Sequence, residues 1–271
     1  MIEFTPEEVE ERANEKFDSG TMTKALVAFV DLLGFKASLE EEWDQDAKSF
    51  ITRILKIKSF IEIAKEKAIV HTFNHYDKET IIDKTQYPDF ITVSDAFIFF
   101  KPIDESSPQK IIISLLSIVA SIYELWRAAI LHGFTIRGAI EFGDVFYSEN
   151  EVIGPSYMEA YRGESKEAKT SRIICFKNLT EIIDANISLV DPVLQDYCKL
   201  WFKKDNDGWV IINPLTAFGI DNEERVGEAL ELIKEMELGV ESDKVKAKYQ
   251  DLIMYLADRR AIYSDLEIFK S

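Results

Sequence analysis

The sequence ALVAFVDLLGF, residues 25–35, is the stretch around which the rest of the chain is organised. Six apolar residues precede one acid, Asp31, and two more lead to Gly34 and Phe35. A short apolar run that ends at a turn signal is typical of a buried strand. A carboxylate at the end of such a strand either hydrogen-bonds the following turn or meets a positive partner, because an unpaired buried charge is costly. The residue types alone leave both interpretations of Asp31 open.

The composition favours one folded domain with an acidic surface. The 271 residues suffice for one large α/β domain or for a domain with an appendage, and a hydrophobic fraction of 46% with 18 Phe supports a packed core. The net charge is −17, from 32 basic and 49 acidic residues. This excludes a general nucleic-acid or anionic-membrane surface, which needs a basic footprint. A polyanionic small ligand would need local cations or metal ions.

Compartment signals indicate a cytoplasmic protein. Cys175 and Cys198 lie in apolar surroundings without a second cysteine at CxxC spacing, so both are predicted to be reduced core residues. The acidic N-terminus has no apolar signal region, and secretion is not expected. The most apolar run, residues 111–123, is shorter than the roughly 20 residues that cross a bilayer. It predicts a buried helix.

Hydrophobic periodicity predicts an alternation of strands and helices. The predicted elements are a helix within residues 1–22, a strand around Asp31, an amphipathic helix over 44–67, a hairpin over 89–101 broken at Ser94-Asp95, a buried helix over 109–131, a strand pair over 134–142 and 144–153, a helix over 157–167, strands over 172–176 and 209–213, and helices over 222–237 and 242–260. This order predicts a sheet with helices on one face. We expect an N-terminal helical segment (1–22), a central domain (23–215) and a helical C-terminal extension (216–271) packed on that domain.

The polar segment 71–88 predicts either a short strand pair or a loop. Its two histidines, His71 and His75, are four residues apart, but no helix and no carboxylate ligand motif accompanies them, so a zinc site is not favoured.

Two acids in similar settings suggest a metal site. Asp31 follows one hydrophobic strand and Asp95 sits in a hairpin. If those strands are neighbours in the sheet, both carboxylates meet at one edge. Such a pair suits Mg²⁺ or Mn²⁺, hard cations that share their remaining ligands with substrate phosphates. The alternative is two unrelated turn acids.

Four blocks in chain order resemble class III nucleotidyl cyclases. They are VDLLGFK with Asp31, ITVSDAFIFF with Asp95, IRGAIEFG with Arg137 and Gly143, and IGPSYMEAYRGE with Gly154, Ala160, Arg162 and Glu164. Ser94 stands where Gly is usual, and Met158 stands where the family has Asn. The variant features, an AYxxE helix followed by SRI and later WVIINP, look most like the stand-alone pyrimidine cyclases of bacterial Pycsar anti-phage systems. The resemblance implies a ferredoxin-like α/β sheet.

The resemblance also implies a reaction and its cofactors. The ribose 3′-hydroxyl of a nucleoside triphosphate would attack the α-phosphate and release pyrophosphate. Two divalent cations, Mn²⁺ or Mg²⁺, would be held by Asp31, Asp95 and the backbone carbonyl of Leu32. The backbone N–H groups of Leu33, Gly34 and Phe35 would face the phosphates.

The resemblance implies that Arg162 of a second protomer stabilises charge on the α-phosphoryl group, which requires a homodimer. The alternative for Arg162 is an exposed helix arginine paired with Glu159 or Glu164. Arg137 is a weaker candidate, because it could pair with Glu141.

In the family that the chain resembles, two positions recognise a purine base, and they correspond here to Ile91 and Glu151. These two residues are used to predict which base the protein selects. Apolar Ile91 stands in place of the Lys or Glu that reads a purine edge, which disfavours ATP and GTP, and Glu151 could accept a hydrogen bond from either pyrimidine. We expect UTP, with CTP next, and a product read by a separate effector in anti-phage defence. The alternatives are a purine cyclase and a catalytically inactive cyclase-like binding or dimerisation module. A diguanylate-cyclase-like palm is disfavoured because no GGDEF-like hairpin occurs.

Overall fold

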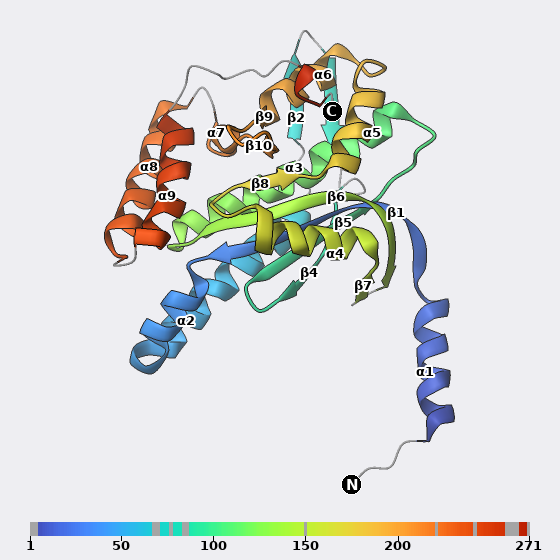
Figure 1. Ribbon diagram of the computed structural model, residues 1–271, viewed down its shortest axis with the longest axis horizontal. Helices are drawn as coiled ribbons and strands as arrows, with labels where there is room; N and C mark the ends of the chain where they lie inside the picture. The colour runs from blue at the N-terminus through green and yellow to red at the C-terminus, as the bar shows by residue number, and fades with distance from the viewer. Residues whose placement is uncertain are drawn as a thin grey trace.

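The computed structural model describes residues 5–66, 71–75, 78–82, 87–148, 151–219, 222–240, 243–257 and 266–269. Within them one large, mostly antiparallel sheet is packed between helices (Figure 1), which confirms the predicted mixed α/β class. The side chains of His71 and His75 lie outside the described part of the structure. The expectation that these two histidines do not form a zinc site is therefore not tested.

The large sheet is organised around the strand predicted at residues 25–31. Its order along the sheet is β4 (Asp89–Val93), β5 (Ala96–Pro102), β1 (Thr21–Leu33), β6 (Thr135–Ser148), β8 (Ile173–Cys175), β10 (Val210–Ile212) and β9 (Phe202–Lys204), with β7 (Glu151–Ile153) paired to β6. Among the strand pairs of the described residues, only the β6–β8 pairing is parallel. A separate two-stranded sheet joins β2 (His71–His75) and β3 (Lys78–Ile82).

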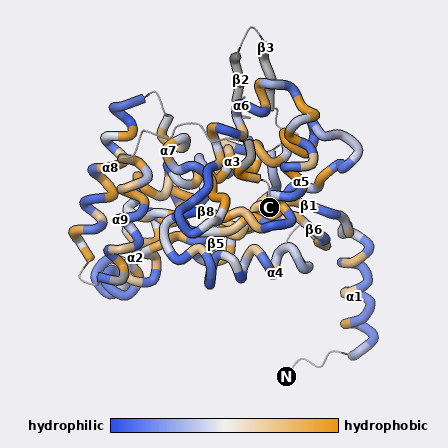
Figure 2. The backbone as a smooth tube through the Cα atoms, turned by 45° about the horizontal axis from the view of Figure 1, so that its top comes forward, coloured by the Kyte–Doolittle hydropathy of each residue, from blue (hydrophilic) through white to orange (hydrophobic). Residues whose placement is uncertain are grey.

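The helices surround this sheet. They are α1 (Pro6–Asp18), α2 (Phe35–Glu66), α3 (Pro108–Leu131), α4 (Pro155–Arg162), a π-helical turn η2 (Gly163–Glu167), α5 (Lys177–Ile187), α6 (Pro192–Trp201), α7 (Pro214–Ala217), α8 (Glu223–Leu238), α9 (Asp243–Ala257) and a 3₁₀ turn η3 (Leu266–Phe269). Among the described helices, only α3 is long and apolar enough to cross a membrane, but its residues are mostly buried in the core. Figure 2 shows hydrophobic residues gathered in this central region.

Successive side chains of β1 point to opposite faces of the sheet. The apolar residues of this strand are therefore shared between the two hydrophobic clusters on those faces. Leu26, Ala28 and Val30 join the main core with α3, whereas Val27 and Phe29 pack on the opposite face. The short helix α4 covers that opposite face, which the sequence analysis did not foresee. Asp31 continues the alternation and therefore faces the α4 side.

Several element boundaries differ from the prediction. The strand pair expected over 134–142 and 144–153 is one long strand, β6, followed by the short β7, because Gly143 stays in the ladder opposite Ala25. Helix α2 begins at Phe35 and is kinked at Asp46, where the side chain accepts a hydrogen bond from the Ser49 amide.

The predicted core cysteines, Cys175 and Cys198, are free and buried, and burial raises the pKa of both thiols. Outside the core, α1 has no buried residue; it contacts the sheet through Phe17, stacked on Phe146. The division of the chain at 22/23 and 215/216 stays a prediction.

Candidate active site

The ends of β1 and of the β4–β5 hairpin meet at one place. Asp31 is paired with Ala96 in the ladder, and the Leu32 amide donates a hydrogen bond to the Asp95 carbonyl oxygen at 3.2 Å. Ser94 at the hairpin tip has φ of 55°, in the left-handed region, which explains why glycine suits this position. The backbone thus brings Asp31 and Asp95 side by side, and Asp95 helps to raise the pKa of Asp31.

This carboxylate pair is electrostatically strained. Burial, and then the neighbouring charges of Asp95 and Glu164, raise the pKa of Asp31 to about 8, while Arg137 opposes the rise. Like charges in a half-buried site favour protonation or a bound cation. The arrangement fits a hard divalent cation, although no group of three or more His, Cys, Asp or Glu side chains in the described ranges is placed to hold one.

Arg137 lies beside the carboxylate pair, in register with Asp31 across the β1–β6 ladder. Its Nη2 atom contacts Glu164 Oε1 and lies 3.9 Å from Asp31 Oδ2. The suggested pairing of Arg137 with Glu141 is therefore wrong. Glu141 instead accepts a hydrogen bond from the amide of its neighbour Phe142 at 2.7 Å, and burial raises its pKa to about 7.

The turn predicted to face phosphates is the N-terminus of a helix. Gly34 has φ of 102°, and its carbonyl accepts a hydrogen bond from the Ser38 amide as α2 begins at Phe35. The first amides of a helix lack intrahelical partners and attract anions. A Cβ at Gly34 would lie 3.1 Å from the hydroxyl of Tyr249 on α9. Leu33 precedes this turn as the last residue of β1, opposite Thr135.

Arg162 does not join the carboxylate pair of its own chain. It ends α4, its side chain is 42% exposed, and it pairs with Glu159 at 2.8 Å and Glu167 at 3.3 Å. Its guanidinium also lies over the Phe176 ring. The suggested partner Glu159 is present, but Glu164 is not a partner, because that side chain is turned inward toward Arg137.

The proposed base-reading positions are spread along the sheet. Ile91 of β4 is half-buried and packs on the α4-side cluster. Glu151 pairs with Lys16 of α1 at 3.0 Å and lies at the opposite end of the β1–β6 ladder from Asp31. Met158, in place of the family's Asn, is exposed on α4.

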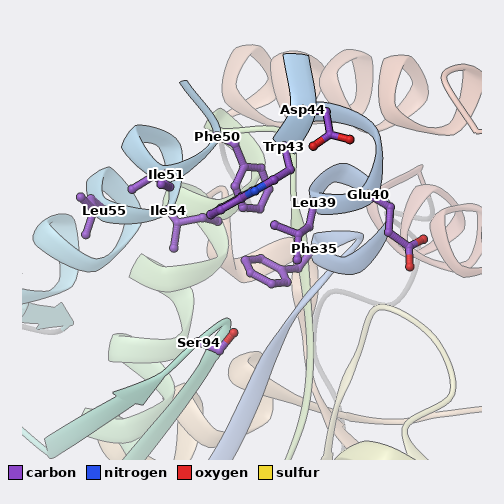
Figure 3. Close-up of a pocket in the computed structure, with 10 residues that line it drawn as sticks. All are labelled: Phe35, Leu39, Glu40, Trp43, Asp44, Phe50, Ile51, Ile54, Leu55 and Ser94. Carbon is purple, nitrogen blue, oxygen red and sulfur yellow. The ribbon is translucent and has the colours of Figure 1, made fainter. Parts of the chain in front are cut away.

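A cavity of about 630 Å³ opens beside Phe35, in the turn that is predicted to face phosphates. Figure 3 shows side chains of both halves of the kinked α2 around it, with Ser94 at the hairpin tip below. None of the described residues that line it is Lys or Arg. The cavity therefore suits an apolar group, and the turn at Gly34 is the better candidate for a phosphate-binding site.

The sequence analysis missed Glu164 as a site residue. The only sequence signal for Glu164 was its place in the AYxxE block. Nothing in the sequence indicates that the Glu164 side chain points into the protein. Glu164 is 4% exposed and reaches Arg137 from the π-helical turn.

Comparisons with known proteins give structural neighbours only. No protein-family model and no curated protein matches the chain. The guanylyl cyclase domain of the RhoGC fusion protein from the aquatic fungus Blastocladiella emersonii is 14% identical, with a TM-score of 0.46, over 72% of this chain and 97% of its own.

Two further solved structures are similar at the same low level. The guanylate cyclase domain of RhGC from Catenaria anguillulae, in complex with GTP, is 15% identical, with a TM-score of 0.40, over 60% of this chain and 84% of its own. A class III adenylyl cyclase-like ATP-binding protein from Pseudomonas aeruginosa is 9% identical, with a TM-score of 0.41, over 66% and 44%. At these values the function has to be argued from the residues of this chain.

Proposed function

We propose that this chain is a nucleotidyl cyclase that converts a nucleoside triphosphate to its 3′,5′-cyclic nucleotide and pyrophosphate. The observation that carries the proposal is the juxtaposition of Asp31 and Asp95, fixed by the bond from the Leu32 amide to the Asp95 carbonyl, directly beside the helix N-terminus at Gly34. A carboxylate pair suits divalent cations, and the helix N-terminus suits phosphates, so the two features together suit a metal-bound triphosphate.

Asp31, Asp95 and the Leu32 carbonyl would hold two divalent cations, Mn²⁺ or Mg²⁺. When bound, these ions supply Lewis acidity for the 3′-hydroxyl and positive charge for the triphosphate. The amides of Leu33, Gly34 and Phe35 would orient the phosphates. This division of roles needs no protein base.

Arg162 would act in a homodimer, facing the α-phosphate bound to the partner chain. The exposure of its side chain, and its pairing with Glu159 and Glu167, support a role across an interface. There it would stabilise the charge that develops on the α-phosphoryl oxygens.

We propose a pyrimidine substrate, UTP before CTP, and purine triphosphates are the alternative. Ile91 offers no polar atom to a purine edge, and Glu151 can accept a hydrogen bond from either pyrimidine. The product would act in the cytoplasm as a messenger for a separate effector, in the anti-phage role that the Pycsar resemblance implies.

The test is incubation of the full chain with each of the four nucleoside triphosphates and Mn²⁺, followed by mass spectrometry. We expect cyclic UMP or cyclic CMP, and no cyclic product from Asp31→Asn. Product from ATP or GTP alone would move the protein to the purine cyclases. No product from any nucleotide would leave the inactive binding module as the better account.

A further inference from the structure

A buried ion pair stands next to the proposed metal ligands. The Nη2 atom of Arg137 contacts Glu164 Oε1 and lies 3.9 Å from Asp31 Oδ2. The Glu164 side chain is 5% exposed, and those of Arg137 and Asp31 are 18% and 24% exposed. The Arg137 guanidinium thus faces two carboxylates, and it contacts Glu164, the more buried of the two.

The hydrogen bonding of this pair is incomplete. Within the described part of the chain, Arg137 Nε is buried without a hydrogen-bond partner, although Nη2 of the same guanidinium contacts Glu164 Oε1. Burying an ion pair that is not fully hydrogen-bonded costs free energy. The pair is therefore a poor stabilising element, and its place beside Asp31 suggests a role in the site.

The backbone is shaped to bring Glu164 to this place. After Arg162 the helix widens into a π-turn, closed by the Ala168 amide bound to the Gly163 carbonyl at 2.9 Å. A Cβ on Gly163 would lie 2.3 Å from the Phe176 ring and 2.6 Å from Ala139, so only glycine allows this close approach to β6. π-turns of this kind are frequent at functional sites.

We propose that Glu164 is a positioning residue of the metal centre, which holds the Arg137 guanidinium away from Asp31 and so leaves the Asp31 carboxylate open to a divalent cation. This inference rests on the proposed function, because it assumes that Asp31 is a metal ligand.

The physical reason is competition for one carboxylate. At 3.9 Å, Arg137 is too far from Asp31 for a hydrogen bond. Without the negative charge of Glu164, Arg137 would turn to Asp31, since a guanidinium binds a carboxylate in a bidentate, charge-assisted manner. It would then occupy the oxygen atoms that a cation needs.

The test measures Mn²⁺ binding to the full chain by electron paramagnetic resonance, without nucleotide. We expect Glu164→Gln to weaken Mn²⁺ binding about tenfold or more, a size typical of residues that orient metal ligands. We expect Arg137→Met to bind Mn²⁺ at least as tightly as the wild type. The double variant Arg137→Met/Glu164→Gln should regain the affinity lost in Glu164→Gln, because the competing cation is gone.

Glu124→Gln is the matched control, because Glu124 is another buried carboxylate in contact with an arginine, Arg127, on α3. It removes the same chemistry far from Asp31, so Mn²⁺ affinity should not change even where thermal unfolding does. If Glu164→Gln does not fold, the inference is still tested by comparing Arg137→Met with the double variant. We expect these two variants to bind Mn²⁺ with equal affinity.

Wild-type affinity in Glu164→Gln would overturn the inference. So would a double variant that binds as weakly as Glu164→Gln, because Glu164 would then act on the ion directly. If the wild type binds no Mn²⁺, the proposed function fails and the inference fails with it, whereas the first two results leave the proposed function intact.

Discussion

The backbone amide of Leu32 donates a hydrogen bond to the carbonyl oxygen of Asp95 at 3.2 Å. This bond ties the hairpin tip to the end of β1, just past the last ladder pair, Asp31 and Ala96. The backbone therefore fixes the two aspartates relative to each other, whatever their side chains do. Preorganisation of this kind is what a ligand pair needs.

Removing one charge from the pair should stabilise the protein without metal. We expect Asp95→Asn to raise the free energy of unfolding by about 1–2 kcal/mol in the absence of metal, because it relieves like-charge repulsion in a half-buried site. The same variant should lose the stabilisation by Mn²⁺, which for the wild type reaches about 2.7 kcal/mol at a hundred times Kd. Urea unfolding with and without Mn²⁺ measures both.

The control for this prediction is Asp144→Asn, a change at an exposed acid of β6. It should leave the response to Mn²⁺ unchanged. Persistent Mn²⁺ stabilisation of Asp95→Asn would contradict a ligand role for Asp95.

Mixing two inactive variants should restore activity if Arg162 acts across a dimer. Asp31→Asn and Arg162→Ala are each expected to be inactive. In a mixed dimer, one of the two sites combines the intact Asp31 of one chain with the intact Arg162 of the other. With random exchange of equal amounts, we expect about a quarter of wild-type cyclisation.

A mixture that stays inactive, although mass spectrometry under native conditions shows mixed dimers, would place Arg162 in its own chain's site. The absence of any dimer would exclude the shared site altogether.

Gly34 should tolerate no side chain. Both Gly34 and Gly208 have positive φ, so alanine at either should cost about 1–2 kcal/mol of unfolding free energy through backbone strain. Only at Gly34 would the new Cβ also crowd the Tyr249 hydroxyl, since nothing lies within 4 Å of a Cβ at Gly208. We therefore expect Gly34→Ala to be the more destabilising change by chemical denaturation, and equal losses would argue against the close contact with α9.

Glu141 should make stability depend on pH. Burial raises its pKa in the folded protein to about 7 from the ordinary 4.5. Between these values the folded state keeps a proton that the unfolded state releases, so the free energy of unfolding falls as pH rises through this range. Glu141→Gln should remove this share of the pH dependence and leave the share that Asp31 contributes, so it should be more stable than the wild type at pH 8 by about 2–3 kcal/mol.

Denaturant unfolding of both proteins from pH 4.5 to 8 checks this prediction. Parallel stability curves for the wild type and Glu141→Gln would show that Glu141 does not titrate in that window.

The elements that the sequence predicted best are those with a strong local pattern. The apolar run before Asp31 forms the central strand, the break at Ser94-Asp95 forms the hairpin, and the apolar run from Ile111 lies in a buried helix. In each, the hydrophobic period agrees with a turn or cap residue at its end.

The sequence predicted less well where a boundary depends on distant contacts. The Gly143 position looked like a strand break but stays in the ladder, because β1 pairs with β6 along its whole length. The start of α2 at Phe35 was also missed, since no capping side chain marks it and Gly34 provides only the turn.

By itself, the sequence determined that Asp31 lies near the end of a buried strand and that Asp95 sits in a tight hairpin, because strand and turn chemistry are local. Only the tertiary structure decided that these two carboxylates meet and that Arg137 faces Glu164. Those contacts join residues far apart in the chain, and their energies depend on burial and on like charges brought together by the pairing of β1 with β5 and β6.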